Sequence, residues 1–385
     1  MADVKGDPEL VLAAAEPLAA AGCRVRVALL TPRGRGALAV VGLAGAEACC
    51  LADRCFQPRG GRPLAARADG SVCVGTWRAA DHLDAPGEEL VVVRRSAEHL
   101  EVHCHGGLAA PEAVLASLEA CGAIRQTWQA WIREQGGGEI SQEARIALAT
   151  AGGPRAARIL CRQLTGCLER EIERLAALPK GPDRTAACGR LLRAARVGLR
   201  LTDPWRVVLA GPVNAGKSSL VNALAGHDRS IVSAEPGTTR DLVTTRIVLG
   251  GWEIELVDSA GLRLDEAAAS ATERAGVARA VAAAGMADLI VRAEPAEETS
   301  HAAGPVGDRE LRVITKVDLV FPDWLAPPDA IATSVVEGRG IAELAAAIVA
   351  RLIPEEREDS DVFAGAVPFT PRQVELIRQL DLGCG

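Results

Sequence analysis

Short apolar runs separated by turns fill the first part of the chain. Residues 24–30 (RVRVALL) alternate between polar and apolar positions as a half-buried strand does, and the TPRGRG that follows is typical of a turn. Three further apolar runs, at residues 37–43, 90–93 and 100–104, predict strands, and residues 111–121 predict a helix. Residues 1–122 are therefore expected to form an α+β domain.

The next region, residues 123–202, has a helical pattern. One helix is expected to run through a series of apolar residues at helical spacing, namely Ile159, Leu160, Leu164, Leu168, Ile172 and Leu175. Lys180-Gly181-Pro182 ends that helix, and a second helix is expected to carry Leu191, Leu192, Ala195 and Leu199. We interpret these stripes as the core-facing sides of a helical domain.

From residue 203 to residue 352, predicted strands and helices alternate. The strands are expected at residues 206–210, 245–249, 253–258, 288–291, 312–315 and 330–333, and the helices after Lys217, at 267–284 and at 341–352. Such alternation predicts a mostly parallel, doubly wound sheet. Residues 353–385 are expected to form an acidic linker (PEEREDSD) followed by a short helical tail.

Composition narrows the class of protein. The 385 residues are 49% hydrophobic and 24% charged, which is ordinary for a globular chain. The absence of Tyr and the net charge of −7 argue against an aromatic platform or a basic coat for nucleic acid, although a local basic patch remains open. We expect no membrane span, no signal peptide, a cytoplasmic location and, for the 11 cysteines, reduced thiols.

The most specific motif lies between the strand WRVVLA and the helix SSLVNALAG. Residues 211–218 (GPVNAGKS) match the phosphate-loop pattern GxxxxGK[ST]. Its glycines let backbone amides surround a polyphosphate, its lysine neutralises the β and γ phosphates, and its final hydroxyl binds Mg²⁺. We therefore expect phosphate binding by a continuous set: Asn214, Ala215, Gly216, Lys217, Ser218 and Ser219.

Two downstream segments fit the same chemistry. Asp258 and Gly261 form a DxxG sequence at the end of an apolar strand, where a carboxylate can hold a magnesium-bound water and a glycine amide can contact the γ-phosphate. The segment GTTRD places Thr238 and Thr239 where GTPases carry a mobile metal-binding threonine. Their spacing after the phosphate loop is what makes both segments evidence for a GTPase.

A third motif predicts the base. Thr315, Lys316 and Asp318 form an [NT]KxD sequence after an apolar strand, with Thr where Asn is more usual. A carboxylate accepts two hydrogen bonds from the N1 and N2 edge of guanine and repels the acceptor at N1 of adenine. Ser334 begins a loop, SVVEGRG, that can lie behind the base. GTP is therefore expected rather than ATP.

The sequence does not directly identify the group that stabilises the charge of the transition state. Leu262 follows the DxxG sequence and cannot orient water as a glutamine does, so a partner arginine or a cation must stabilise the transition state. Asn214 can coordinate a monovalent cation within the phosphate loop. The alternative, an amide that only braces the loop, fits this sequence equally well.

These motifs resemble the MnmE (TrmE) family of tRNA-modification GTPases. The segments GPVNAGKSSLVNALAG, SIVSAEPGTTRD, LVDSAGLR and TERAG are similar to that family's G domain in order and nearly in spacing. TPRGRGA and EVHCHGG resemble its N-terminal domain. Together the resemblance covers most of residues 25–352.

The resemblance implies three domains: an N-terminal dimerising, folate-binding domain, a helical domain, and a G domain inserted in the helical one. It also implies GTP hydrolysis driven by potassium-dependent dimerisation of G domains. By that analogy K⁺ is bound by Asn214, Ser233, Thr238 and the Glu235 backbone, and Mg²⁺ by Ser218 and Thr239. Glu273, in TERAG, then positions the attacking water beside Lys217.

The chain also departs from the family pattern. The family closes with CIGK, whereas this chain is expected to be C-terminally shortened, with Cys384 outside that motif. Gly42 stands where an arginine is expected, and of the implied folate contacts only Glu101 is in place. Folate binding is therefore doubtful. The run from His103 to His105 lacks a third ligand for a metal.

Two functions follow as alternatives. The first is a GTPase that acts with a flavin-dependent partner of the MnmG (GidA) type on the wobble uridine of tRNA, as a homodimer. The second is a nucleotide-driven dimerising switch or assembly module that has lost the one-carbon chemistry. A ribosome-assembly GTPase is a weaker third option, because the sequence shows no obvious RNA-binding appendage.

Overall fold

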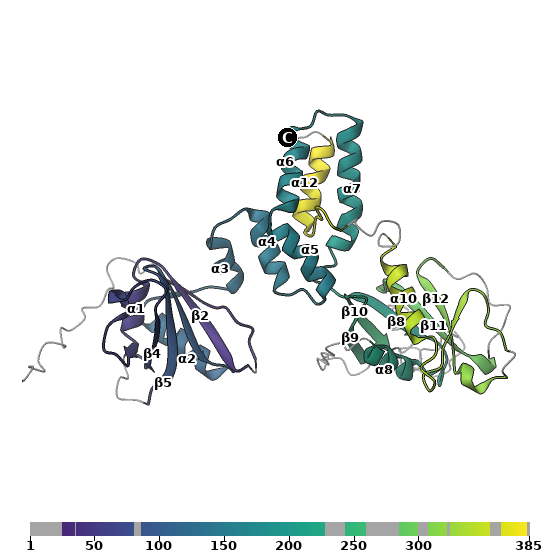
Figure 1. Cartoon of the computed structure of the whole chain (residues 1–385), viewed down its shortest axis with the longest axis horizontal. Helices are drawn as coiled ribbons and strands as arrows, with labels where there is room; N and C mark the ends of the chain where they lie inside the picture. Colours follow the sequence, from purple (N-terminus) through teal and green to yellow (C-terminus); the bar gives the residue numbers. More distant parts are fainter. Residues whose placement is uncertain are drawn as a thin grey trace, which may run out of the picture. The chain divides into compact units, whose positions relative to one another are not determined.

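The computed structural model describes residues 25–34, 36–80, 86–227, 243–258, 285–298, 307–321, 324–354 and 363–382. The chain divides into two compact units, Met1–Gly136 and Gly137–Gly385 (Figure 1). None of the helices within the described ranges is long and apolar enough to span a membrane.

The first unit is built on one sheet. Its strands are β1 (Arg26–Leu29), β2 (Leu38–Ala44), β3 (Phe56–Pro58), β4 (Val72–Trp77), β5 (Glu88–Ser96), β6 (His99–His105) and β7 (Ile124–Arg125), in the order β3-β4-β5-β6-β2-β1-β7. All neighbours are antiparallel except β1 and β7. The helices are α1 (Ala48–Asp53), η1 (Leu64–Ala66), α2 (Ala109–Ala120) and α3 (Trp128–Glu134). The four predicted strands and the predicted helix α2 are confirmed.

Strand β4 shows why the prediction was incomplete. It alternates between exposed and buried positions, but its exposed positions include Val72 and Val74. Apolar residues therefore stand on both faces, and the two-residue period that normally reveals a strand is hidden. Strands β3 and β7 have three and two residues, too few to form a pattern.

The second unit begins with helices α4 (Glu139–Leu148), α5 (Pro154–Leu164), α6 (Cys167–Ala177) and α7 (Pro182–Gly198), and ends with α12 (Pro371–Leu382). The prediction of one helix through residues 159–175 was wrong. The helix breaks at Gly166, whose φ of 83° is left-handed and ends helical hydrogen bonding. In Figure 1, α12 lies beside α6 and α7, and its Ile377 shares a buried cluster with Leu175 and Leu191.

Between α7 and α12 lies a six-stranded sheet. Its strands are β8 (Trp205–Ala210), β9 (Val243–Leu249), β10 (Trp252–Asp258), β11 (Leu289–Pro295), β12 (Glu310–Thr315) and β13 (Ala330–Ala332). The helices described in this region are α8 (Lys217–His227), η2 (Ala296–Glu298), η3 (Val317–Leu319) and α10 (Ile341–Leu352). The order is β13-β12-β11-β8-β10-β9, and only β9 with β10 is antiparallel. The predicted, mostly parallel sheet is confirmed; the helix predicted at 267–284 lies outside the described residues.

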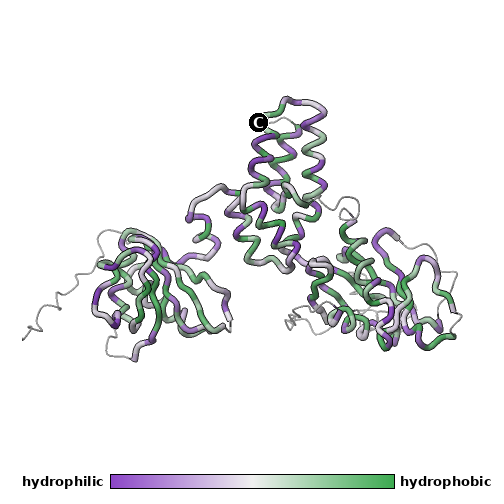
Figure 2. The backbone as a smooth tube through the Cα atoms, viewed as in Figure 1, coloured by the Kyte–Doolittle hydropathy of each residue, from purple (hydrophilic) through white to green (hydrophobic). Residues whose placement is uncertain are grey.

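Helices and sheet of this unit share one hydrophobic core. Figure 2 shows mainly hydrophobic strands, whereas helices α5 to α7 alternate between hydrophilic and hydrophobic positions, as helices with one buried face do. Ile159 and Leu160 of α5 belong to the same buried cluster as Val207 of β8 and Trp252 of β10. Phe363, just before α12, contacts Trp252 edge to face with ring centroids 6.0 Å apart. The helices therefore pack directly on the sheet.

Candidate nucleotide-binding site

The loop between β8 and α8 has the backbone that a phosphate loop requires. Asn214 and Gly216 have φ values of 66° and 79°, a left-handed conformation that Asn and Gly tolerate best. Gly211 passes so close to strand β11 that a Cβ there would lie 2.2 Å from the Ala293 carbonyl oxygen. The predicted strand–loop–helix junction at residues 211–218 is thus present, with α8 beginning at Lys217.

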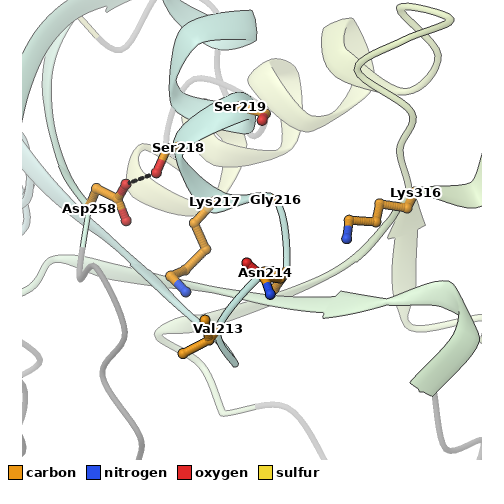
Figure 3. A pocket seen from close by; sticks show the side chains of 9 residues that line it. Val213, Asn214, Gly216, Lys217, Ser218, Ser219, Asp258 and Lys316 are labelled. Atoms are coloured by element: carbon orange, nitrogen blue, oxygen red, sulfur yellow. Dashed lines mark hydrogen bonds between the residues drawn. The ribbon is translucent and has the colours of Figure 1, made fainter.

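A cavity of about 550 Å³ opens over this loop (Figure 3). It is lined by Val213, Asn214, Ala215, Gly216, Lys217, Ser218, Ser219, Asp258 and Lys316. The structure therefore brings together the predicted phosphate-binding set with one carboxylate and one lysine from the ends of two other strands. Val213 was not predicted; its place inside the GPVNAGKS motif was the available signal.

The ammonium of Lys217 is bound to the backbone of the phosphate loop. Its side chain is 6% exposed, and its Nζ donates to the carbonyl oxygens of Gly211 and Pro212 at 3.0 and 2.8 Å. Burial lowers the pKa of Lys217, and the nearby negative charge of Asp258 partly opposes that shift. Among the described residues, the hydrogen bonds of this buried ammonium go to neutral carbonyls, so it is short of negative charge, which an incoming phosphate supplies.

Ser218 and Asp258 meet across the cavity. The Ser218 hydroxyl donates to Asp258 Oδ2 at 2.5 Å, as Figure 3 shows, and Asp258 is 5% exposed. The other carboxylate oxygen, Oδ1, is buried and has no hydrogen-bond partner among the described residues. Because a buried unpaired carboxylate oxygen is costly, this pair of oxygen ligands fits a hard cation such as Mg²⁺.

The base-recognition motif is tied to the phosphate loop by its threonine. Thr315, 4% exposed, donates from Oγ1 to the Ala215 carbonyl oxygen at 2.8 Å, with the Glu294 carbonyl oxygen at 3.3 Å. The hydroxyl thus joins two loops that are far apart in the sequence. Lys316 adopts a left-handed φ of 58° and reaches the cavity, as Figure 3 shows.

Asp318 and Ser334 do not line the cavity. Asp318 lies on η3, is half-buried, and has no hydrogen-bond or ion-pair partner within the described ranges. Ser334 is fully buried; its backbone pairs with Arg339 and its hydroxyl accepts from the Glu337 amide at 3.2 Å. Ser334 therefore shapes the loop SVVEGRG internally.

The remaining predicted residues lie outside the described residues. They are Ser233, Glu235, Thr238, Thr239, Gly261 and Glu273, together with Leu262 and Cys384. Their assignments stay predictions.

In the first unit, the two positions discussed for folate are cross-strand neighbours, since Gly42 of β2 pairs with Glu101 of β6. The Glu101 carboxylate contacts Arg95 at 2.8 Å and His103 at 3.2 Å, and Arg95, followed by His103, lowers its pKa. The indole of Trp131, from α3, covers Gly42 so closely that a Cβ there would lie 2.6 Å from Cζ2. His103 faces Glu101 and His105 binds Glu88, so each histidine already has a carboxylate partner.

Comparison with known proteins places this geometry in a family. A model of the 50S ribosome-binding GTPase family matches residues 206–316. The tRNA modification GTPase MnmE of Symbiobacterium thermophilum is 34% identical over 76% of this chain and 73% of its own length. MnmE of Thermus thermophilus is 32% identical over 91% of this chain and 86% of its own. Among solved structures, the G domain of the T. maritima iron transporter FeoB matches 38% of this chain and 98% of that chain at 26% identity, with a TM-score of 0.27. The site and the relatives agree on a GTP-hydrolysing enzyme, and the chain belongs to the MnmE family of tRNA modification GTPases.

Proposed function

We propose that this chain hydrolyses GTP at the cavity over residues 213–219 and that this hydrolysis serves the modification of the tRNA wobble uridine. The observation that carries the proposal is the cluster of Lys217, Ser218 and Asp258, whose ammonium and unpaired carboxylate oxygen fit a triphosphate with its magnesium ion. Similarity to MnmE over most of the chain supports the tRNA role.

Each side chain then has a distinct task. Lys217 exchanges its two carbonyl contacts for the β and γ phosphates, and the phosphate-loop amides surround the polyphosphate. Ser218 and Thr239 would hold Mg²⁺, and Asp258 would hold a water bound to that ion. Thr315 keeps the base motif against the loop, and Asp318 recognises guanine. Glu273 positions the attacking water.

We further propose that a potassium ion bound beside Asn214 supplies positive charge in the transition state, with Ser233, Thr238 and the Glu235 backbone as its other ligands. Asn214 lines the cavity, and Leu262, which follows the DxxG sequence, offers no polar group.

GTP turnover is therefore expected to be about 100-fold or more higher in KCl than in NaCl at equal ionic strength, since removing one group that stabilises transition-state charge costs about 10²- to 10³-fold. In Asn214→Gly, which keeps the positive φ but lacks the amide, the two rates should converge. Phosphate release under single-salt conditions measures both. Equal rates for the wild-type protein would remove Asn214 as a cation ligand.

The domain boundaries are proposed as 1–122, 123–202, 203–352 and 353–385, with the last segment completing the helical domain. Contacts between residues 363–382 and the earlier helices support that completion: Arg372 of α12 binds Glu143 of α4 through two bonds of 2.9 Å, and Gln163 of α5 donates to the carbonyl oxygen of Gly365, before α12, at 3.2 Å. The N-terminal domain is proposed to dimerise, and a flavoprotein of the MnmG type is the proposed partner.

Folate does not fit the residues of the first unit. An arginine at position 42 would have to displace the Trp131 indole, and the Glu101 carboxylate is engaged by Arg95 and His103. The second candidate function is a nucleotide-driven dimerising module that has lost one-carbon chemistry, whereas the similarity to MnmE supports the first. We therefore assign no step to folate.

Mass spectrometry of wobble uridines in tRNA from a strain that lacks this protein separates the two candidates. Loss of a modified wobble uridine that returns with the wild-type gene, but not with a Lys217→Ala gene, is the expected result. An unchanged set of modified uridines would reject the tRNA role and leave the assembly module.

A further inference from the structure

The turn between β9 and β10 contacts the start of helix α5 backbone to backbone. The turn is Gly250-Gly251, with φ values of 56° and 86°, and it joins strands that pair from Trp252–Leu249 to Asp258–Val243. The residues facing it, Gly152 and Gly153, precede α5. They lie outside the segment that matches the GTPase family model.

Glycines on both sides make this approach possible. A Cβ on Gly153 would lie 2.6 Å from the Gly251 carbonyl oxygen, and a Cβ on Gly152 would lie 1.7 Å from Glu253 Oε2. In the other direction, a Cβ on Gly251 would lie 2.6 Å from Arg155 Cγ. At Gly153 a Cβ would meet the backbone of the turn and force the turn away, whereas at Gly152 it would meet the end of the Glu253 side chain, which can swing aside.

Hydrogen bonds hold the contact together. The Arg155 amide, one of the donors that a helix N-terminus leaves unsatisfied, donates to the Gly251 carbonyl oxygen at 3.1 Å. The Arg155 Nε donates to the Gly250 carbonyl oxygen at 3.3 Å. Trp252, the first residue of β10, packs against Phe363 from the segment before α12. One end of β10 is thus held by helical elements that come both before and after the GTPase segment.

The other end of β10 is Asp258. Strand β10 spans about 20 Å at ~3.4 Å per residue, and its register with both β8 and β9 is unbroken. A continuous, hydrogen-bonded strand therefore connects the Gly250-Gly251 turn with the carboxylate that accepts from Ser218.

From this arrangement we propose that helix α5 positions Asp258 through β10, with Arg155 and Gly153 as positioning residues for GTP hydrolysis. The inference rests on the proposed function, since it concerns the same site. Because coupling between sites is reciprocal, the nucleotide at the cavity also changes the stability of the α5 start. A change at the start of α5 therefore alters the position of Asp258, and a bound nucleotide alters the stability of the α5 start, through the contact with the Gly250-Gly251 turn.

The test compares four variants of the full chain. Gly153→Ala forces the turn away, and Arg155→Ala removes the Nε bond; Gly365→Ala, whose Cβ meets nothing within 4 Å, and Arg158→Ala, on the same helix, are matched controls. We expect kcat for GTP hydrolysis to fall about 3- to 30-fold in the first two variants, the range found along coupled paths. KM should change little, because the phosphate loop itself is untouched.

Hydrogen exchange at the amides of residues 155–158 provides the second readout, which a merely structural contact would not move. We expect the wild-type amides to exchange at different rates with GDP and with a non-hydrolysable GTP analogue, and this difference to vanish in Gly153→Ala. Should both test variants match the controls in kcat, or should wild-type exchange ignore the nucleotide, the inference is overturned. A wild-type chain that fails to hydrolyse GTP would instead overturn the proposed function itself.

Discussion

Replacing Lys217 by alanine is expected to lower GTP turnover by about 10²- to 10³-fold, the effect of deleting one preorganised charge-stabilising donor. Lys217 is the cation that the cavity holds against the loop, with its Nζ on the carbonyls of Gly211 and Pro212. Negative charge that develops on the phosphates has no equivalent partner in the variant, because the other lysine that lines the cavity, Lys316, comes from a different strand end.

The loss should appear in turnover and not in folding. Burial lowers the pKa of Lys217, so the charged form of this side chain is disfavoured in the nucleotide-free fold. Replacing Lys217 by alanine removes a desolvated ammonium and is therefore not expected to destabilise the fold. The sign of the linkage follows: between the depressed pKa and the ordinary value of 10.5, the unfolded chain binds more protons, so the cost that this group imposes on folding falls as pH rises.

Phosphate release measures the turnover, and thermal unfolding of the nucleotide-free protein measures the fold. Lys180→Ala, in the exposed turn between α6 and α7, is the matched control and should retain wild-type turnover. Full activity of Lys217→Ala would refute the assignment of the cavity. Unfolding of that variant at a much lower temperature would contradict the view that Lys217 acts on the nucleotide.

Replacing Asp318 by asparagine is expected to weaken GTP binding by about 100-fold or more. Hydrogen bonds to a charged group contribute roughly 1.5–3 kcal/mol each, and the proposed contact with the N1 and N2 edge of guanine includes two. Asp318 is half-buried and has no protein partner within the described part of the chain, so its carboxylate is not committed elsewhere.

The same change should alter which base is preferred. An asparagine amide can donate where the carboxylate only accepts, and xanthine carries a carbonyl where guanine carries the N2 amino group. Xanthosine triphosphate is therefore expected to bind the variant better than GTP does, as fluorescence titration of each nucleotide can measure. Asp308→Asn, on an exposed turn, is the control. If the variant still prefers GTP to the same degree, another residue recognises the base.

Local motifs account for the parts of the site that the sequence alone predicted. The backbone of residues 211–218 depends on glycine and asparagine at left-handed positions, and a contiguous motif records such requirements directly. The end of β10 at Asp258 was predicted for a similar reason, because a strand pattern stops where DSAG begins. The parallel sheet followed from the alternation of strands and helices over residues 203–352.

Short or two-faced elements were missed because their local pattern is weak. Strand β4 exposes valines, and the break at Gly166 falls inside a continuous apolar stripe. At β4 the exposed valines hide the two-residue period, and at Gly166 one left-handed glycine interrupts a stripe that the sequence continues.

By itself, then, the sequence determined the phosphate loop, the TKVD motif at the end of β12 and their order on a parallel sheet, since these depend on residues close together in the chain. Only the tertiary structure decided the contacts between distant residues: Thr315 on the Ala215 carbonyl, Trp131 over Gly42 in the first unit, and the glycine pairs at 152–153 and 250–251. These contacts link distant residues, and their distances depend on how whole elements pack, which no local spacing encodes.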